Sequence, residues 1–303
     1  MCGLIAGLLA EPRLHDSQVS GVLALLRHRG PERSAFWFDE SRRTLLGHVR
    51  LSLAGLENDR QPPVDPATGM RCIVNGAFYR SRANLAAESD SEIALQLYDE
   101  LGPDCVQQLR GEFAFVIADR SRRCLFAARD RFGVKPLYYA IHGGDVLLAS
   151  EIKALFELGV PARWDEAAYF AECHGVLPAE RTLFAGVHAV PPGCYLIARD
   201  GTVSIHAYWD LEFPDREQLA RDPRSEREIT GGLRELLDQA VADRMVADVE
   251  VAAYLSGGID SSAVLGLAQR HSRRPIRAFT VVFEDAAYDE ERPARETAAF
   301  VGA

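Results

Sequence analysis

Two hydrophobic patterns divide this chain near residue 208 and limit the folds that it can adopt. Up to that point, short apolar segments recur at hairpin spacing with few helical segments between them, which favours packed antiparallel sheets. Beyond it, a helical pattern over 230–247 precedes an apolar strand over 249–255, a helix over 261–271 and a buried strand over 276–283. This β-α-β order predicts a parallel sheet of nucleotide-binding type. The sequence therefore indicates an α+β sandwich of antiparallel sheets followed by an α/β domain.

The two predicted domains are separated by a charged, proline-bearing segment over 209–228, which we interpret as a linker. The first domain then covers 2–208, and the second covers 229–303. Helices in the first domain are predicted to begin at Asp16 or Ser17, at Ser89 and at Ser150. The strands predicted in this domain cover 3–9, 35–38, 44–53, a segment from Arg71, 113–119, 124–130, 136–142 and 145–150.

Composition excludes several classes of protein. The 303 residues carry a formal net charge of −10, so a nucleic-acid surface is not expected. Six cysteines are scattered without a CxxC pair, which argues against a disulfide framework or a structural zinc site and favours a reducing cytoplasm. The chain has neither a signal-peptide pattern nor an apolar run of about 18 residues, so we expect no membrane association.

The first residues carry a candidate nucleophile. Cys2 follows the initiator methionine, so removal of Met1 would leave a thiol and a free α-amine on the same residue. Such an amine has an ordinary pKa of about 7.7–8.0 and a thiol one of about 8.5, so the neutral amine can accept the thiol proton and leave a nucleophilic thiolate. The alternative is a chance cysteine at a frayed terminus. The buried strand predicted from Gly3 argues against fraying, because it would fix the terminus.

A second motif, SGGIDSS at 256–262, lies between a predicted strand and a predicted helix. Two glycines let the backbone approach an anion closely, and the helix that follows offers exposed N–H groups and a favourable dipole. Three serines add hydroxyl donors, and Asp260 can hold a magnesium ion. The alternative is an ordinary turn with a serine cap. The motif is not a GxxxxGK[ST] loop, because no lysine follows the glycines, and this absence favours chemistry that releases pyrophosphate.

Cys2 and SGGIDSS, in this order, resemble the glutamine-hydrolysing asparagine synthetases. That family joins a class II glutamine amidotransferase domain, an αββα N-terminal-nucleophile sandwich, to an ATP pyrophosphatase-like synthetase domain. The resemblance extends from residue 1 to about 285. It is carried, in family order, by RHRGPE (27–32), GHVRLSL (47–53), VNG (74–76), SDSEI (89–93), RGEFAFVIAD (110–119), ARDRFGVKPLYY (128–139), SEIKAL (150–155) and PPGCYL (191–196).

The resemblance implies a glutamine site in the first domain. Cys2 would attack the glutamine carboxamide to give a glutamyl thioester and ammonia. The Asn75 side chain and the Gly76 backbone N–H would stabilise the oxyanion. Arg50 would bind the glutamine α-carboxylate, a task suited to a guanidinium group, and Asp90 would accept from the α-ammonium.

The resemblance also implies that ATP and Mg²⁺ are used in the second domain. ATP would adenylate a carboxylate, most simply that of aspartate, and ammonia would displace AMP to give asparagine. A homodimer is the family expectation. The residues implied for ATP binding are Leu255, Ser256, Gly257, Gly258, Asp260, Ser261, Ser262 and Val281, with Asp260 also on the metal.

The chain departs from the family pattern in two places. The family usually has a glutamate after Asn-Gly that helps to hold the glutamine amine, and here Ala77 takes its place. Losing one charged contact would cost about 1.5–3 kcal/mol of binding unless a neighbour substitutes. The chain also stops at Ala303, shortly after the second strand of the α/β domain. Either the sequence is a fragment, or a second polypeptide completes the synthetase domain.

Three functions follow from these observations. The first is an asparagine synthetase, or a relative that amidates another carboxylate in a specialised biosynthetic pathway. The second is a glutaminase subunit that supplies ammonia to a separate synthetase. The third is a non-catalytic regulatory or structural relic, which Ala77 and the early end of the chain favour. It is opposed by the intact Cys2, Arg50, Asn75, Gly76 and Asp90. Relatives that form β-lactams and have lost glutamine hydrolysis are disfavoured because Cys2 is present.

Overall fold

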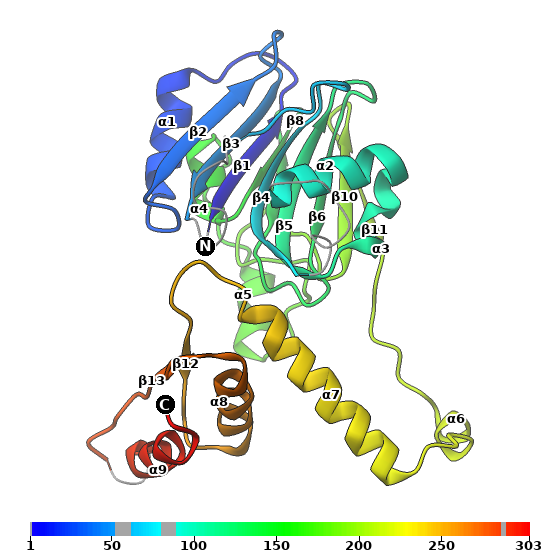
Figure 1. Cartoon of the computed structure of the whole chain (residues 1–303). Helices are drawn as coiled ribbons and strands as arrows, with labels where there is room; N and C mark the ends of the chain where they lie inside the picture. Colours follow the sequence, from blue (N-terminus) through cyan, green and yellow to red (C-terminus); the bar gives the residue numbers. More distant parts are fainter. Residues whose placement is uncertain (1, 52–61, 80–88, 286–288) are drawn as a thin grey trace. The chain divides into compact units, whose positions relative to one another are not determined.

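The computed structural model describes residues 2–51, 62–79, 89–285 and 289–303. The chain divides into two compact units, Met1–Leu211 and Glu212–Ala303 (Figure 1). In the described part of the chain, the first unit holds two antiparallel sheets and the second holds one small parallel sheet.

The first unit contains a six-stranded sheet with the strand order β2-β3-β1-β8-β7-β9 and a five-stranded sheet with the order β11-β10-β6-β5-β4. Neighbouring strands in both sheets are antiparallel, as predicted. The strands are β1 (Gly3–Leu8), β2 (Arg33–Phe38), β3 (Thr44–Arg50), β4 (Arg71–Phe78), β5 (Gly111–Asp119), β6 (Cys124–Arg129), β7 (Tyr138–His142), β8 (Asp145–Ala149), β9 (Val187–Ala189), β10 (Cys194–Arg199) and β11 (Thr202–Ala207).

Helices cover the outer face of each sheet and complete an αββα sandwich, which confirms the predicted fold class (Figure 1). Helices α1 (Asp16–Leu25) and α4 (Ile152–Glu157) pack on the six-stranded sheet. Helix α2 (Asp90–Leu101) packs on the five-stranded sheet and is followed by η2 (Gly102–Asp104) and α3 (Cys105–Gln108). The remaining helix of this unit in the described residues is α5 (Glu166–Cys173).

Alternating side chains of the central strands enter different cores. Leu4 belongs to the core between the two sheets, whereas Ile5 belongs to the core beneath α1. In β4, Ile73 faces the inner core and Val74 the outer one. Because both faces are buried, these strands are almost continuously apolar. The same period of two places Cys2 and Asn75 on the inner faces of their sheets.

The second unit contains α6 (Arg216–Ala220), α7 (Glu226–Arg244), β12 (Ala252–Tyr254), α8 (Ile259–His271), β13 (Arg277–Phe279) and α9 (Glu291–Val301). Strands β12 and β13 are parallel, as predicted. Both are shorter than the expected strands over 249–255 and 276–283, because only three residue pairs form a ladder between them. No helix in the described part of the chain is long and apolar enough to span a membrane.

The expected linker over 209–228 contains helical structure that periodicity did not reveal. Asp215 and Gln218 form a capping box that begins α6. Ser225 and Glu228 form another, so α7 begins at Glu226, four residues before the predicted start at 230. A capping box stabilises a helix start through two reciprocal hydrogen bonds, which offsets the charged and weakly periodic composition.

Gly30 is a strict steric requirement of the first unit. A Cβ atom at this position would lie 2.5 Å from Arg50 N and Val49 C, and neither backbone atom can move without disturbing β3. We expect Gly30→Ala to lower the free energy of unfolding by at least about 2 kcal/mol. Gly21→Ala is the matched control: in α1, nothing lies within 4 Å of its Cβ position, and alanine should stabilise the helix by about 0.5–1 kcal/mol. Equal stabilities in urea denaturation would contradict this account.

Candidate active site

Cys2 is held in place immediately before β1. The Leu51 N–H donates to the Cys2 Sγ atom at 3.4 Å, and Sγ lies 3.5 Å from the Leu51 carbonyl oxygen. Arg29 Nε donates to the Cys2 carbonyl oxygen at 3.0 Å. The side chain is half-buried rather than free in solvent. These contacts are those of a fixed residue, in agreement with the argument against a frayed terminus.

The register of the sheets brings further polar groups to this end of the sandwich. Gly3 pairs with Val49 in the β1–β3 ladder, so Cys2 comes next to Arg50 at the end of β3. The His48 ring Nε2 lies 3.0 Å from the Val74 carbonyl oxygen and links the two sheets. Asn75, the next residue of β4, therefore lies at the same end as Cys2. Arg50 and Asn75 are both buried, with 6% and 0% of their surface exposed.

Asn75 is a buried amide without a partner. Neither its Nδ2 nor its Oδ1 atom has a hydrogen-bond partner among the described residues. An unsatisfied buried polar group costs about 1–3 kcal/mol, so such an amide is either a defect or a preformed site for a ligand.

Gly76 and Asp90 complete the set predicted from the sequence. Gly76 has φ +150°, and a Cβ there would lie 1.9 Å from the Glu112 carbonyl oxygen, so only glycine fits. Asp90 is the first residue of α2, which Ser89 caps, and Asp90 Oδ1 accepts from Phe78 N at 3.4 Å. This contact places the Asp90 carboxylate at the end of β4.

An ion network beside Cys2 was missed by reasoning from sequence. Glu151 Oε1 accepts from Arg29 Nη1 at 3.0 Å and from His28 Nε2 at 2.8 Å, and Lys153 Nζ lies 3.0 Å from Oε2. Burial alone would raise the pKa of the Glu151 carboxyl, but hydrogen bonds from Arg29, Lys153 and His28 outweigh it and lower the pKa to about 2. Arg29 thus joins the Cys2 carbonyl to an ionised carboxylate. The segments RHRGPE and SEIKAL were the available signal.

Glu112 is a further residue that reasoning from sequence missed. It pairs with Ala77 across the β4–β5 ladder, so the two side chains lie on the same face of the sheet. Glu112 Oε2 lies 3.2 Å from Lys135 Nζ, and both side chains are largely buried, at 23% and 14% exposed. A carboxylate therefore lies beside the small Ala77.

The SGGIDSS segment of the second unit forms the turn between β12 and α8. Gly257 has φ +77°, and a Cβ there would lie 2.8 Å from Ala294 N. Gly258 is the N-cap of α8 and forms no side-chain cap hydrogen bond, and its own N–H donates to Ser256 Oγ at 3.4 Å. Ser256 Oγ and Ser261 Oγ lie 3.0 Å apart, and Asp260 is exposed in the first turn. An exposed, uncapped helix start of this kind suits an anion.

The other residues predicted for this site differ in their surroundings. Leu255 is buried, and its N–H donates to the Phe279 carbonyl oxygen at 2.9 Å. Val281 lies beyond the end of β13 and is 65% exposed, so it is not a core residue of the unit. Ser262 Oγ lies 3.4 Å from Thr297 Oγ1 of α9. Among the described residues, no three His, Cys, Asp or Glu side chains form a metal-binding cluster.

Comparisons with known proteins match the two parts of the chain to two families. Residues 1–209 match the family of the glutamine amidotransferase domain, and residues 232–303 match the asparagine synthase family. The protein named amidase chry2 of Gibberella zeae is 42% identical over 305 residues, which cover 92% of this chain and 45% of that protein. A glutamine-hydrolysing asparagine synthetase of Bacillus subtilis is 33% identical over 307 residues, which cover 94% of this chain and 48% of that protein.

A solved structure described as the allosteric regulatory enzyme of purine biosynthesis shares the fold. It aligns with a TM-score of 0.52 at 16% identity and covers 94% of this chain and 66% of that one. The fold and the family match together identify residues 1–209 as a glutamine amidotransferase domain. This chain belongs to the family that joins such a domain to an asparagine synthase segment, as the glutamine-hydrolysing asparagine synthetases do. It spans about half the length of the curated relatives described above.

Replacing Glu151 with glutamine tests the ion network. At neutral pH, the variant should be less stable than the wild type by about 1–3 kcal/mol, because the Arg29 guanidinium loses its charged partner. Folding lowers the pKa of Glu151 from 4.5 to about 2, so the carboxylate contributes fully above pH 4.5 and its contribution is lost as the pH falls toward 2.

The difference in unfolding free energy between the wild type and Glu151→Gln should therefore narrow as the pH falls from 4.5 toward 2. Lys153→Gln is the matched control, with a smaller effect at pH 7 because that side chain is 48% exposed. A difference that stays constant with pH would show that the charge of Glu151 is not what stabilises this network.

Proposed function

We propose that this protein is a glutamine-dependent and ATP-dependent amidotransferase. Cys2 hydrolyses glutamine to glutamate and ammonia, and the ammonia amidates an adenylated carboxylate. The observation that carries the proposal is the buried amide of Asn75, which has no hydrogen-bond partner in the described part of the chain and lies at the end of the sandwich where Cys2 is fixed. In this reading, residues 2–208 are the glutaminase domain and 229–303 belong to the synthetase domain, with the segment 209–228 between them.

The chemistry at Cys2 follows from the groups around it. Once Met1 is removed, the α-amine takes the thiol proton, and Sγ attacks the carboxamide carbon. The oxyanion that forms accepts from Asn75 Nδ2 and from the Gly76 N–H. Collapse breaks the C–N bond, the ammonium form of the amine returns the proton, and ammonia leaves. Water then attacks the thioester to release glutamate and restore the thiol.

Substrate binding depends on charged groups at the same end. Arg50, buried next to Cys2, binds the glutamine α-carboxylate, and Asp90 accepts from the α-ammonium. Glu112 is our candidate for the neighbour that replaces the glutamate absent at Ala77, because the two residues pair across the β4–β5 ladder. A carboxylate has enough lone pairs to accept from both Lys135 and a substrate ammonium.

The turn between β12 and α8 is the proposed ATP site. The uncapped N–H groups of α8 and the hydroxyls of Ser256, Ser261 and Ser262 would bind the pyrophosphate portion. Leu255 and Val281 would line the adenine. Gly257 and Gly258 would allow the phosphates to approach the backbone. Mg²⁺ typically takes one or two carboxylates together with substrate phosphates, which fits the single exposed carboxylate of Asp260.

The proposed acceptor is aspartate, with asparagine as the product. The name of the Gibberella zeae relative, an amidase, and its 42% identity favour a second candidate, another carboxylate in a specialised biosynthetic pathway. A glutaminase subunit that donates ammonia to a second polypeptide is the further alternative. We place the reaction in the cytoplasm, where the six cysteines would stay reduced, and expect a homodimer from the family.

Ammonia release from glutamine by the purified protein tests the proposal. The wild type, with Met1 shown by mass spectrometry to be removed, should release ammonia, and Cys2→Ala should release none. Asn75→Ala should lower kcat by about 10²–10³-fold, because one oxyanion donor is lost. Cys173→Ala is the matched control, since that cysteine is exposed at the end of α5 and should not matter.

Folded protein that lacks Met1 and releases no ammonia would overturn the glutaminase assignment. AMP and pyrophosphate formed when a carboxylate acceptor is added would favour the complete amidotransferase. Ammonia release without any ATP consumption, in the presence of each candidate acceptor, would favour the ammonia-donor alternative.

Glu112→Gln should raise the KM for glutamine about tenfold or more with little change in kcat, because a charged contact to the substrate ammonium is lost. Glu157→Gln, on the exposed surface of α4, is the control and should leave KM unchanged. Adding Ala77→Glu to Glu112→Gln should restore a low KM, since the two side chains lie on the same face. An unchanged KM in Glu112→Gln would remove Glu112 from the site.

A further inference from the structure

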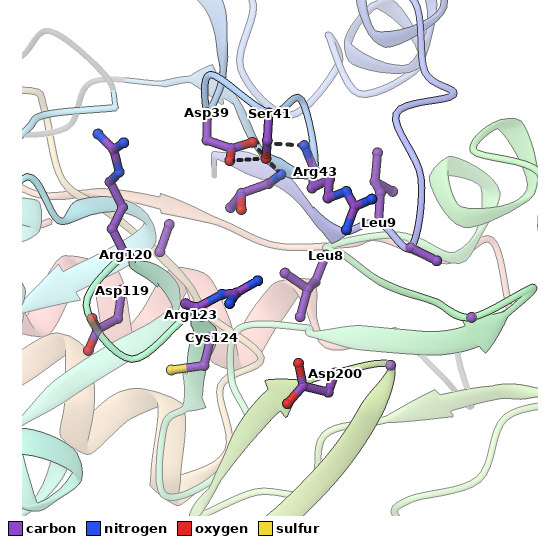
Figure 2. A pocket seen from close by; sticks show the side chains of 15 residues that line it. Leu8, Leu9, Asp39, Ser41, Arg43, Asp119, Arg120, Arg123, Cys124 and Asp200 are labelled. Atoms are coloured by element: carbon purple, nitrogen blue, oxygen red, sulfur yellow. Dashed lines mark hydrogen bonds between the residues drawn. The ribbon is translucent and has the colours of Figure 1, made fainter.

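A cavity of about 520 Å³ opens at the end of the first unit opposite to Cys2 (Figure 2). It lies where β1 ends, at Leu8–Ala10, six residues beyond Cys2 and hence about 20 Å away along the strand. Four hairpin turns meet around it, those of β2–β3, β5–β6, β7–β8 and β10–β11. The charged residues that they contribute are Asp39, Arg43, Asp119, Arg120, Arg123 and Asp200.

Two of the acidic residues that line the cavity are fully engaged by their own turns. Asp39 Oδ1 accepts from Arg43 N at 2.8 Å and from Thr44 N at 2.7 Å. Asp119 Oδ1 accepts from Ser121 Oγ at 2.7 Å and from Arg122 N at 2.9 Å. These carboxylates therefore shape the rim and do not compete for a ligand.

Two arginines are not engaged in this way. Arg43 and Arg123 come from different turns, and Figure 2 shows both side chains extending into the space beside Leu8. Neither guanidinium group forms an ion pair within the described part of the chain, whereas Arg120 on the same rim lies 3.5 Å from Glu40. Asp200 likewise has no pairing partner among those residues. The cavity thus offers two cationic groups and one carboxylate.

The backbone supports a role for these side chains. Arg123 and Asp200 have φ +51° and +49°, a left-handed conformation in which glycine or asparagine is preferred. Arg42 shares this conformation, but its guanidinium pairs with Asp16 at 2.6 Å and has a structural partner. Arg123 has no such partner in the described residues. A charged side chain at a strained backbone position that favours glycine indicates a functional role, such as binding a ligand.

We propose that this cavity binds a small acidic amino acid. The two guanidinium groups suit its carboxylates, because arginine binds carboxylates in a two-point geometry, and Asp200 suits its ammonium. Leu8 and Leu9 provide apolar wall for its methylene groups. The volume lies in the range of small-molecule pockets. The site is separate from the glutamine site and does not depend on the function proposed above.

Calorimetric titration of the full chain with L-glutamate tests the proposal. We expect a saturable binding component that Arg43→Gln and Arg123→Gly each weaken at least tenfold. Arg123→Gly should not lower the melting temperature, because glycine relieves the left-handed conformation. The rim variant Arg120→Gln should bind like the wild type. The saturable binding of L-glutamate should persist in Arg50→Gln, because this variant removes only the carboxylate contact proposed for the site at Cys2.

Chemical specificity gives a second readout. Glutarate, which lacks the ammonium, should bind the wild type more weakly than L-glutamate does, and Asp200→Asn should remove this preference. Ammonia release from glutamine without added glutamate should be unchanged in the Arg43 and Arg123 variants. The proposal is overturned if L-glutamate shows no saturable binding, or if inorganic phosphate binds more tightly than L-glutamate. It is also overturned if L-glutamate binding is unchanged in both arginine variants, or if it disappears in folded Arg50→Gln.

Discussion

The position of β1 inside the six-stranded sheet is the constraint on which the rest of the first unit depends. Strand β3 pairs with one edge of β1 and β8 with the other, and both faces of β1 are buried. A shift by one residue would exchange the inner and outer cores, so the register is strongly fixed. Cys2, one residue before this strand, therefore has a defined position, and Leu51 and Arg29 hold its thiol and carbonyl.

The same architecture explains how the site tolerates polar groups in an apolar interior. Arg50, His48 and Asn75 lie on inner faces that otherwise hold leucine, isoleucine and alanine. His48 is satisfied by a carbonyl of the opposite sheet. The Asn75 amide forms no hydrogen bond to any described residue, and the stability of the surrounding sandwich offsets the free-energy cost of burying it. In the proposed reaction, a buried amide without a competing partner would stabilise the charge that develops on the substrate oxygen.

Local sequence signals were sufficient for much of the fold. The apolar strand behind Cys2, the Ser89 cap of α2 and the parallel β12–β13 pair were all predicted. The helices within 209–228 were not, because their capping boxes at Asp215 and Ser225 occur in a charged segment without a clear apolar period. The ends of β12 and β13 were overestimated, because a ladder extends only as far as its partner strand and apolar composition does not reveal that limit.

The sequence by itself determined the identity of the chemical groups and the turns that present them. Cys2 before a buried strand and SGGIDSS before a helix are local patterns whose conformations follow from residues close in the chain. Tertiary structure alone decided which distant groups meet. Arg29 and Glu151 are separated by 122 positions, and Ala77 meets Glu112 only through the β4–β5 register. Periodicity predicts which face a side chain occupies, whereas sheet order and packing decide what lies opposite it.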